Sequence, residues 1–125
     1  MAFGSDLPAA ARRHLKAADI LDGNKRRDVA GYLYGIAAEC AVKAIMIGHL
    51  RRDDWLYKHF PDLRTLLRDR ISGRRSAVLN QFINDDSFMN NWDIKMRYAS
   101  GREILDRWVD AWKDQARQVV SKICT

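Results

Sequence analysis

Apolar residues are concentrated in one continuous stretch, residues 29–50, with the sequence VAGYLYGIAAECAVKAIMIGHL. The stretch favours a helix, and only Glu39 and Lys43 interrupt its apolar character before Gly48. A helix that is hydrophobic on all sides is buried in a bilayer or at the centre of a helical domain. Because two charges in the middle of the stretch are costly in lipid, the pattern predicts the core helix of a domain without membrane contact. Gly31 and Gly35 form a notch on it for the backbone of a neighbouring helix.

The N-terminal segment predicts an amphipathic helix, because apolar residues recur there at every third or fourth position. This helix is expected from Leu7 to about Leu21. Ser5 or Asp6 supplies its N-terminal cap, and Pro8 is tolerated in its first turn.

Three further helices are predicted in the second half of the chain. One opens at Pro61, a short one covers residues 76–83, and the last covers residues 101–123 behind a capping box of Ser100 and Glu103. Residues 84–91 are expected to form a polar loop, and residues 92–98 an extended segment or an irregular turn. The sequence therefore predicts an all-α fold, an up-and-down bundle of four main helices plus a short one, in a single domain of residues 1–125.

Composition and charge narrow the class of protein. Hydrophobic residues make up 47% of the 125 residues and charged residues 30%, a balance that supports a core without disulfides or metal. The net charge of +6 favours a polyanionic partner such as nucleic acid, a nucleotide or an acidic protein. Cys40 and Cys124 form neither a disulfide framework nor a metal-binding spacing, and no signal peptide is evident. We therefore expect a cytoplasmic protein without a cofactor.

The two charges of the central helix are candidates for a functional pair. Glu39 precedes Lys43 by four residues, which is the favourable order for an ion pair on one helix face. Two interpretations remain open at this point. The pair is structural and buried, or it lines a polar pocket that holds a phosphate or a base.

The helix after Pro61 and the residues that follow it carry the densest basic region of the chain. Arginine suits phosphate groups because its guanidinium is planar and donates two parallel hydrogen bonds. The region is a candidate anion-binding patch, and the alternative is an ordinary solvated surface. Its members are Arg64, Arg68, Arg70, Arg74 and Arg75.

Among the three histidines, His59 has the most distinctive surroundings, since Tyr57 and Phe60 lie beside it and a predicted helix begins directly after it. Such surroundings hold an imidazole ring in one orientation, for a structural role or for a site. The chain has no glycine-rich phosphate loop, no metal-ligand spacing and no Ser/His/acid order typical of a triad.

Three short segments together resemble the HEPN family, which is named for higher eukaryotes, prokaryotes and nucleotide binding. They are AAECAVKAIM at residues 37–46, HFPDLRTLL at residues 59–67, and Arg97-Tyr98 before a long amphipathic helix. The resemblance implies a bundle of four to five helices, a homodimer and a nucleotidyltransferase partner. It also implies a role in a toxin–antitoxin or phage-defence system.

Catalytic HEPN proteins are metal-independent ribonucleases with an arginine, four to six residues and a histidine on a late helix. No histidine follows His59 here, so Arg97 lacks a partner in that place. Arg52 precedes His59 at a suitable spacing, but in a different part of the bundle. The resemblance therefore favours a non-catalytic module that binds a nucleotide, RNA or a nucleotidyltransferase. A ribonuclease that uses His59 with Arg52 or Arg97 and a structural interaction dimer are the alternatives.

In the non-catalytic interpretation, a polar cluster or interface replaces the ribonuclease site. Its predicted members are Glu39, Lys43, His59, Arg97 and Tyr98.

Overall fold

A computed structural model of the chain describes residues 4–47, 55–70 and 77–123. Every regular element in these ranges is helical, which confirms the all-α prediction. The α-helices are α1 (Leu7–Gly23), α2 (Arg27–Met46), α4 (Asp62–Arg70), α5 (Ala77–Ile83) and α6 (Asp106–Val120), and η2 (Ile94–Tyr98) is a 3-10 helix. Asp6 caps α1 as expected, with its carboxylate accepting the Ala9 N–H at 3.1 Å.

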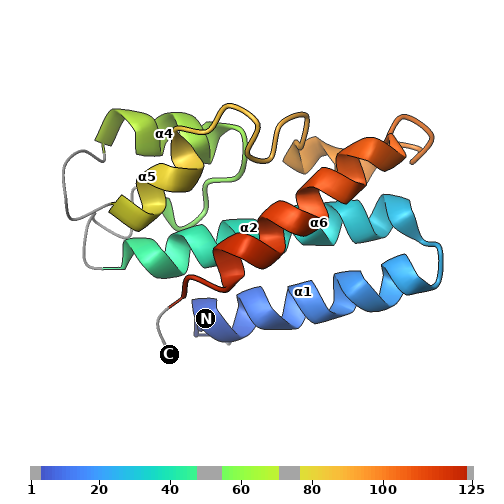
Figure 1. The fold of residues 1–125 in the computed structure, drawn as a ribbon, viewed down its shortest axis with the longest axis horizontal. Coiled ribbons are helices and arrows are strands. Elements are labelled where there is room, and N and C mark those ends of the chain that lie inside the picture. Colours follow the sequence, from blue (N-terminus) through green and yellow to red (C-terminus); the bar gives the residue numbers. More distant parts are fainter. Residues whose placement is uncertain (1–3, 48–54, 71–76, 124–125) are drawn as a thin grey trace.

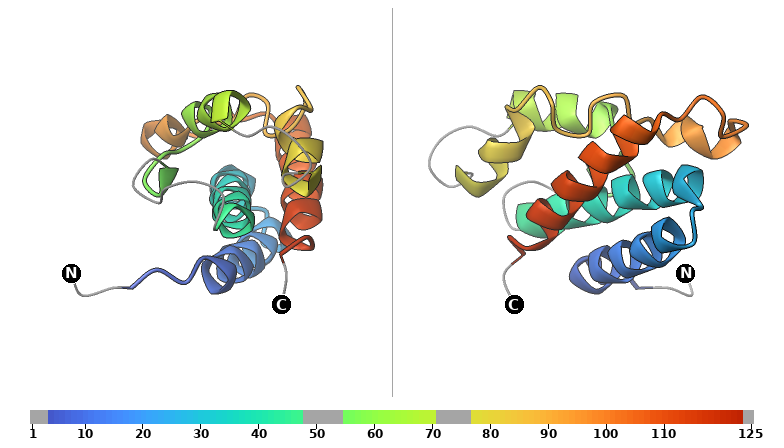
Figure 2. Two further views of the ribbon diagram at one scale, coloured as in Figure 1. Left: turned by 90° about the vertical axis from the view of Figure 1, so that its left-hand side faces the viewer. Right: turned by 45° about the vertical axis from the view of Figure 1, so that its right-hand side comes forward.

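The helix α2 lies in the middle of the bundle (Figures 1 and 2). The helices α1 and α2 form an antiparallel hairpin, and α6 crosses α2 along another face. The helix α4 covers α2 from the side opposite to α1 (Figure 2). Neighbours on several sides explain why the sequence of α2 has no polar face.

The apolar length of α2 is that of a core helix. In the ranges that the structure describes, α2 is also the one helix that is long and apolar enough to cross a membrane. Its mean hydropathy is 1.3. However, 61% of its most apolar window is buried inside the fold. Core helices of globular domains share these properties, so the finding is weak evidence for a membrane span.

The glycine notch on α2 receives indole rings. The Trp92 Nε1–H donates a hydrogen bond to the Gly31 carbonyl at 3.1 Å, and a Cβ atom at Gly35 would lie 1.9 Å from the Trp92 ring. A Cβ atom at Gly31 would lie 3.0 Å from the ring of Trp112 on α6. Close packing at these glycines was expected, but the partners are tryptophan side chains and not the backbone of a helix.

The predicted start of the last helix is wrong. The helix α6 begins at Asp106, and the residues before it form turns. Gly101 has a φ of +93°, a left-handed conformation that ends helical geometry, so Ser100 and Glu103 do not form a capping box. A capping box instead opens η2, where the Asp93 carboxylate accepts the Lys95 N–H at 2.9 Å. Residues 92–98 therefore form the irregular turn and not the extended segment.

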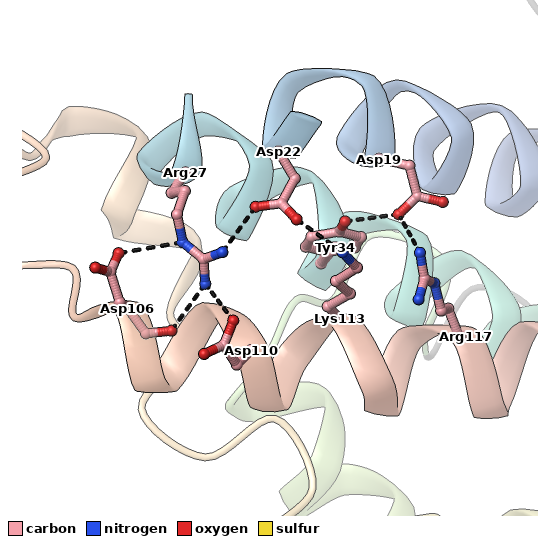
Figure 3. A network of polar contacts seen from close by, with 8 residues as sticks. All are labelled: Asp19, Asp22, Arg27, Tyr34, Asp106, Asp110, Lys113 and Arg117. Carbon is pink, nitrogen blue, oxygen red and sulfur yellow. Dashed lines mark hydrogen bonds and ion pairs between the residues drawn. The ribbon is translucent and has the colours of Figure 1, made fainter. Parts of the chain in front are cut away.

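A network of charged side chains joins α1, α2 and α6 (Figure 3). Arg27 at the start of α2 pairs with Asp22 of α1 at 3.0 Å and also with Asp106 and Asp110 of α6. Lys113 of α6 pairs with the second oxygen of Asp22 at 2.8 Å. The central helix is thereby tied at its N-terminal end to both neighbours. Asp19, Tyr34 and Arg117 continue the network, with the Tyr34 hydroxyl donating to Asp19 at 2.6 Å.

Replacing Asp22 with asparagine is expected to reduce stability in a pH-dependent manner. The hydrogen bond from Lys113 and the charge of Arg27 lower the pKa of Asp22 below its ordinary value of 3.8. The carboxylate therefore stabilises the folded state above pH 3.8, and this contribution is lost as the pH falls through the lower folded-state pKa. We expect a loss of about 1.5–3 kcal/mol at neutral pH.

Urea unfolding at neutral pH and at successively lower pH measures this effect. The difference between wild type and Asp22→Asn should shrink below pH 3.8. Asp114→Asn, at an exposed position on the same bundle, is the control and should leave stability nearly unchanged. A difference that stays constant with pH would show that Asp22 acts through packing and not through its charge.

Candidate functional site

A buried carboxylate on α2 holds a histidine at the surface. Glu39 is only 2% exposed, and its Oε1 lies 2.8 Å from Nδ1 of His59. Its Oε2 accepts the backbone N–H of Phe60 at 2.7 Å. Both carboxylate oxygens thus bind the segment that leads into α4, an arrangement that suits an ionised carboxylate.

Contacts of the backbone and of the neighbouring Phe60 hold the segment that carries His59 in place. The His59 carbonyl accepts the N–H of Leu63 in α4 at 2.7 Å. Phe60 is buried and packs edge-on against Phe88 and Trp92 at centroid distances of 5.8 and 6.1 Å. The backbone around His59 is therefore fixed, and the contact with Glu39 orients the imidazole ring on it.

Lys43 completes the buried charged group. Its Nζ lies 4.0 Å from Oε1 of Glu39, and the residue is 5% exposed. Burial lowers the pKa of Lys43, and the Glu39 charge acts in the opposite direction. Burial raises the pKa of Glu39, against the hydrogen bonds from His59 and Phe60 and the charge of Lys43. The expected i,i+4 pair is present and shares its carboxylate with the histidine.

A cleft of about 340 Å³ opens beside His59. The His59 side chain is 38% exposed, and its Nδ1 is engaged by Glu39. Its Nε2 has no hydrogen-bond partner in the part of the chain that the structure describes, and it is the ring nitrogen available to a ligand. The polar side chains around the cleft belong to Tyr57, Lys58, His59, Asp62, Asp93 and Lys95.

This arrangement controls what the histidine can do. When the imidazole is neutral, Nδ1–H donates to Glu39 and Nε2 accepts a proton or a hydrogen bond. When it is protonated, Nδ1–H still donates to Glu39 and Nε2–H donates to an anion. Lys58 and Lys95 are exposed at the cleft, and within the described ranges neither ammonium group has an ion-pair partner. A phosphate group in the cleft would find three donors.

The predicted polar cluster divides into two groups. Glu39, Lys43 and His59 meet, whereas Arg97 and Tyr98 lie at the other end of η2 and contact each other. The Arg97 guanidinium stacks 5.1 Å from the centroid of the Tyr98 ring, which is 78% exposed. Arg97 lines a second pocket, which shares no lining residue with the first.

The predicted basic patch is partly engaged within the fold. Arg64 donates to the carbonyls of Asp85, at 2.7 Å, and Phe88. Arg68 donates to the carbonyl of Ile83 at 2.8 Å and pairs with Asp86. These two arginines connect α4 by hydrogen bonds and an ion pair to the end of α5 and to the loop after it. Arg70 is exposed at the end of α4, and Arg52, Arg74 and Arg75 lie outside the described residues.

Sequence reasoning missed two lysines of the cleft. Lys58 directly precedes His59, so its position was available from the sequence. Lys95 is brought to the cleft by η2, and no sequence signal links it to His59.

The described ranges contain no group of three His, Cys, Asp or Glu side chains arranged to hold a metal ion. Comparisons with models of protein families, with curated proteins and with solved structures find no match. The chemistry of the site is therefore inferred from its own side chains.

Proposed function

We propose that this chain is a HEPN-like helical module that binds phosphate groups of RNA or of a nucleotide in the cleft beside His59. One observation carries the proposal: Glu39 holds Nδ1 of His59, which leaves Nε2 as the ring nitrogen available to a ligand at a cleft that His59 lines. A buried carboxylate that orients a partly exposed histidine is typical of sites where the ring contacts a ligand.

The charges around the cleft support an anionic ligand. Lys58 and Lys95 place two positive charges at the cleft beside the His59 imidazole. The whole chain carries a net charge of +6. Phosphate contacts of this kind make affinity depend steeply on salt. Asp62 and Asp93 also line the cleft. Their carboxylates disfavour a densely charged anionic surface and favour a ligand whose phosphates are separated from one another.

The proposal extends to the setting that the HEPN resemblance implies. In this view the chain is a cytoplasmic homodimer that works beside a nucleotidyltransferase partner in a toxin–antitoxin or defence system. Co-purification of the chain with its genomic neighbours and measurement of its mass in solution test these two points.

A metal-independent ribonuclease is the second candidate, because the Glu39–His59 couple also suits a general base. Nε2 of His59 would take the proton of a ribose 2′-hydroxyl as that oxygen attacks the adjacent phosphorus. The charges of Lys58 and Lys95 would stabilise the developing phosphorane. The 5′-oxygen would leave with a proton taken from water, and the 3′ side of the cut would end in a 2′,3′-cyclic phosphate. Arg97 lies at the other end of η2 and has no part in this scheme.

Incubation of labelled RNA with the protein in EDTA, with binding followed in the same samples, tests both candidates. We expect intact RNA, salt-sensitive binding, and affinity about 10- to 100-fold lower for His59→Ala. Lys122→Ala removes an exposed charge just after α6 and should bind like the wild type. Cleavage that disappears in His59→Ala would establish the ribonuclease instead. The absence of both binding and cleavage would contradict the proposal.

A further inference from the structure

The second pocket lies between the first turns of α2 and the chain around η2, with a volume of about 190 Å³. Val29, Met96 and Ile104 form its apolar walls. Its polar side chains are those of Asp28, Tyr32 and Arg97. The pocket thus combines one carboxylate and one guanidinium with apolar walls, in a space that suits a single small heterocycle.

The carboxylate of this pocket belongs to Asp28, which lies near the start of α2. Asp28 is half-buried in the first turn of α2, and within the described ranges it makes no hydrogen bond or ion pair. Its Oδ2 lies 2.7 Å from the position that a Cβ atom at Gly101 would occupy. The backbone of Gly101 therefore passes close against the carboxylate, and the absence of a side chain there keeps the carboxylate in place and accessible.

Tyr32, one turn after Asp28 on α2, and Arg97 of η2 also line the pocket. Tyr32 stacks on the buried ring of Trp92, with centroids 6.0 Å apart and planes at 17°. The Trp92 Nε1–H is itself bonded to the Gly31 carbonyl. The pKa of Arg97 is raised above its ordinary value, chiefly by a side-chain hydrogen bond with Tyr32. Asp28 and Arg97 line the same pocket without forming an ion pair with each other. A ligand can therefore contact the Asp28 carboxylate, and the Arg97 guanidinium, which has five N–H donors, can bind a ligand in addition to Tyr32.

We infer that this pocket binds a guanine base, with the Asp28 carboxylate accepting the N1–H and the 2-amino group. Guanine presents these two parallel donors to a carboxylate, whereas adenine and cytosine each present one amino group on the corresponding edge. Val29, Met96 and Ile104 contact the faces and edges of the ring, and Arg97 pairs with the attached phosphate. The inference rests on the proposed function in that it assigns a base preference to a chain that binds RNA phosphates at His59.

Equilibrium binding of two labelled oligonucleotides tests the inference with the full chain. One is a uridine hexamer, and the other is the same hexamer with one guanine. We expect the guanine to tighten binding about tenfold or more in the wild type. Asp28→Asn should abolish this gain and leave the affinity for the uridine hexamer unchanged. The control Asp114→Asn should keep the gain. Equal affinity for the two hexamers, or a gain that survives Asp28→Asn, would overturn the inference and leave the proposed function intact.

Loss of the proposed function has a different signature. If the wild type binds neither hexamer, phosphate binding at His59 fails, and titration with GMP and AMP decides the pocket by itself. A shift of the Gly101 amide resonance with GMP but not with AMP, absent in Asp28→Asn, would support the guanine site. Equal shifts with both nucleotides, or none, would refute it.

Discussion

Replacing Gly35 with alanine is expected to lower the free energy of unfolding by about 3 kcal/mol. A Cβ atom at this position would lie 1.9 Å from the Trp92 ring, well inside van der Waals contact. Trp92 cannot retreat without cost, because its Nε1–H is bonded to the Gly31 carbonyl and its ring packs against Phe60 and Tyr32. The added methyl group must therefore displace the indole that links α2 to η2 and to the segment of His59.

Urea denaturation of Gly35→Ala beside Gly23→Ala measures this effect. Gly23 ends α1, and a Cβ atom at Gly23 would meet no neighbouring atom within 4 Å, so alanine there should change stability by less than about 1 kcal/mol in either direction. Similar stabilities for the two variants would show that the Trp92 contact is not tight. Because Trp92 also packs on Phe60, Gly35→Ala should in addition weaken RNA binding in the cleft.

Removal of the Glu39 side chain is expected to cost about 3–5 kcal/mol. Glu39→Ala leaves the buried ammonium of Lys43 without its counter-charge and the Phe60 N–H without its acceptor. His59→Ala should cost less, because the imidazole is partly exposed and Glu39 keeps its bonds to Phe60 and Lys43. Chemical unfolding of the two variants under identical conditions provides the comparison.

A double variant separates the charge from the packing. Glu39→Leu with Lys43→Met replaces both buried charges by apolar groups of similar size and should recover most of the stability lost in Glu39→Ala. The double variant should still fail to bind RNA, since His59 loses the carboxylate that orients it. If Glu39→Ala lowered the free energy of unfolding only as much as His59→Ala, the buried charge of Glu39 would contribute little to stability.

The sequence predicted the helices best where burial alone determines them. A helix that is apolar on all sides, such as α2, must lie at the centre of a globular domain. The cap at Asp6 depends only on residues next to it in the sequence. The start of α6 could not be predicted from Ser100 and Glu103, because the left-handed conformation of Gly101 depends on its contact with α2. A local capping motif does not contain that information.

The residues of the candidate site could be predicted from the sequence, but their contacts could not. Glu39, Lys43 and His59 were each identifiable, since a charge within an apolar helix and a histidine among aromatics are visible in the sequence. The bond between Glu39 and His59 joins residues 20 positions apart and depends on how the chain before α4 is packed. The separation of Arg97 from this group depends on the course of η2, which the sequence left open between an extended segment and a turn.

The measurement that tests the central proposal most directly is an amide-resolved NMR titration of the protein with the uridine hexamer. Ligand in the cleft should shift the resonances of Lys58, His59 and Lys95, and these shifts should weaken as salt is added. The same titration of His59→Ala should need a higher concentration of the hexamer. Shifts confined to α1, where Arg12, Arg13 and Lys16 are exposed, or no shifts at all, would contradict phosphate binding beside His59.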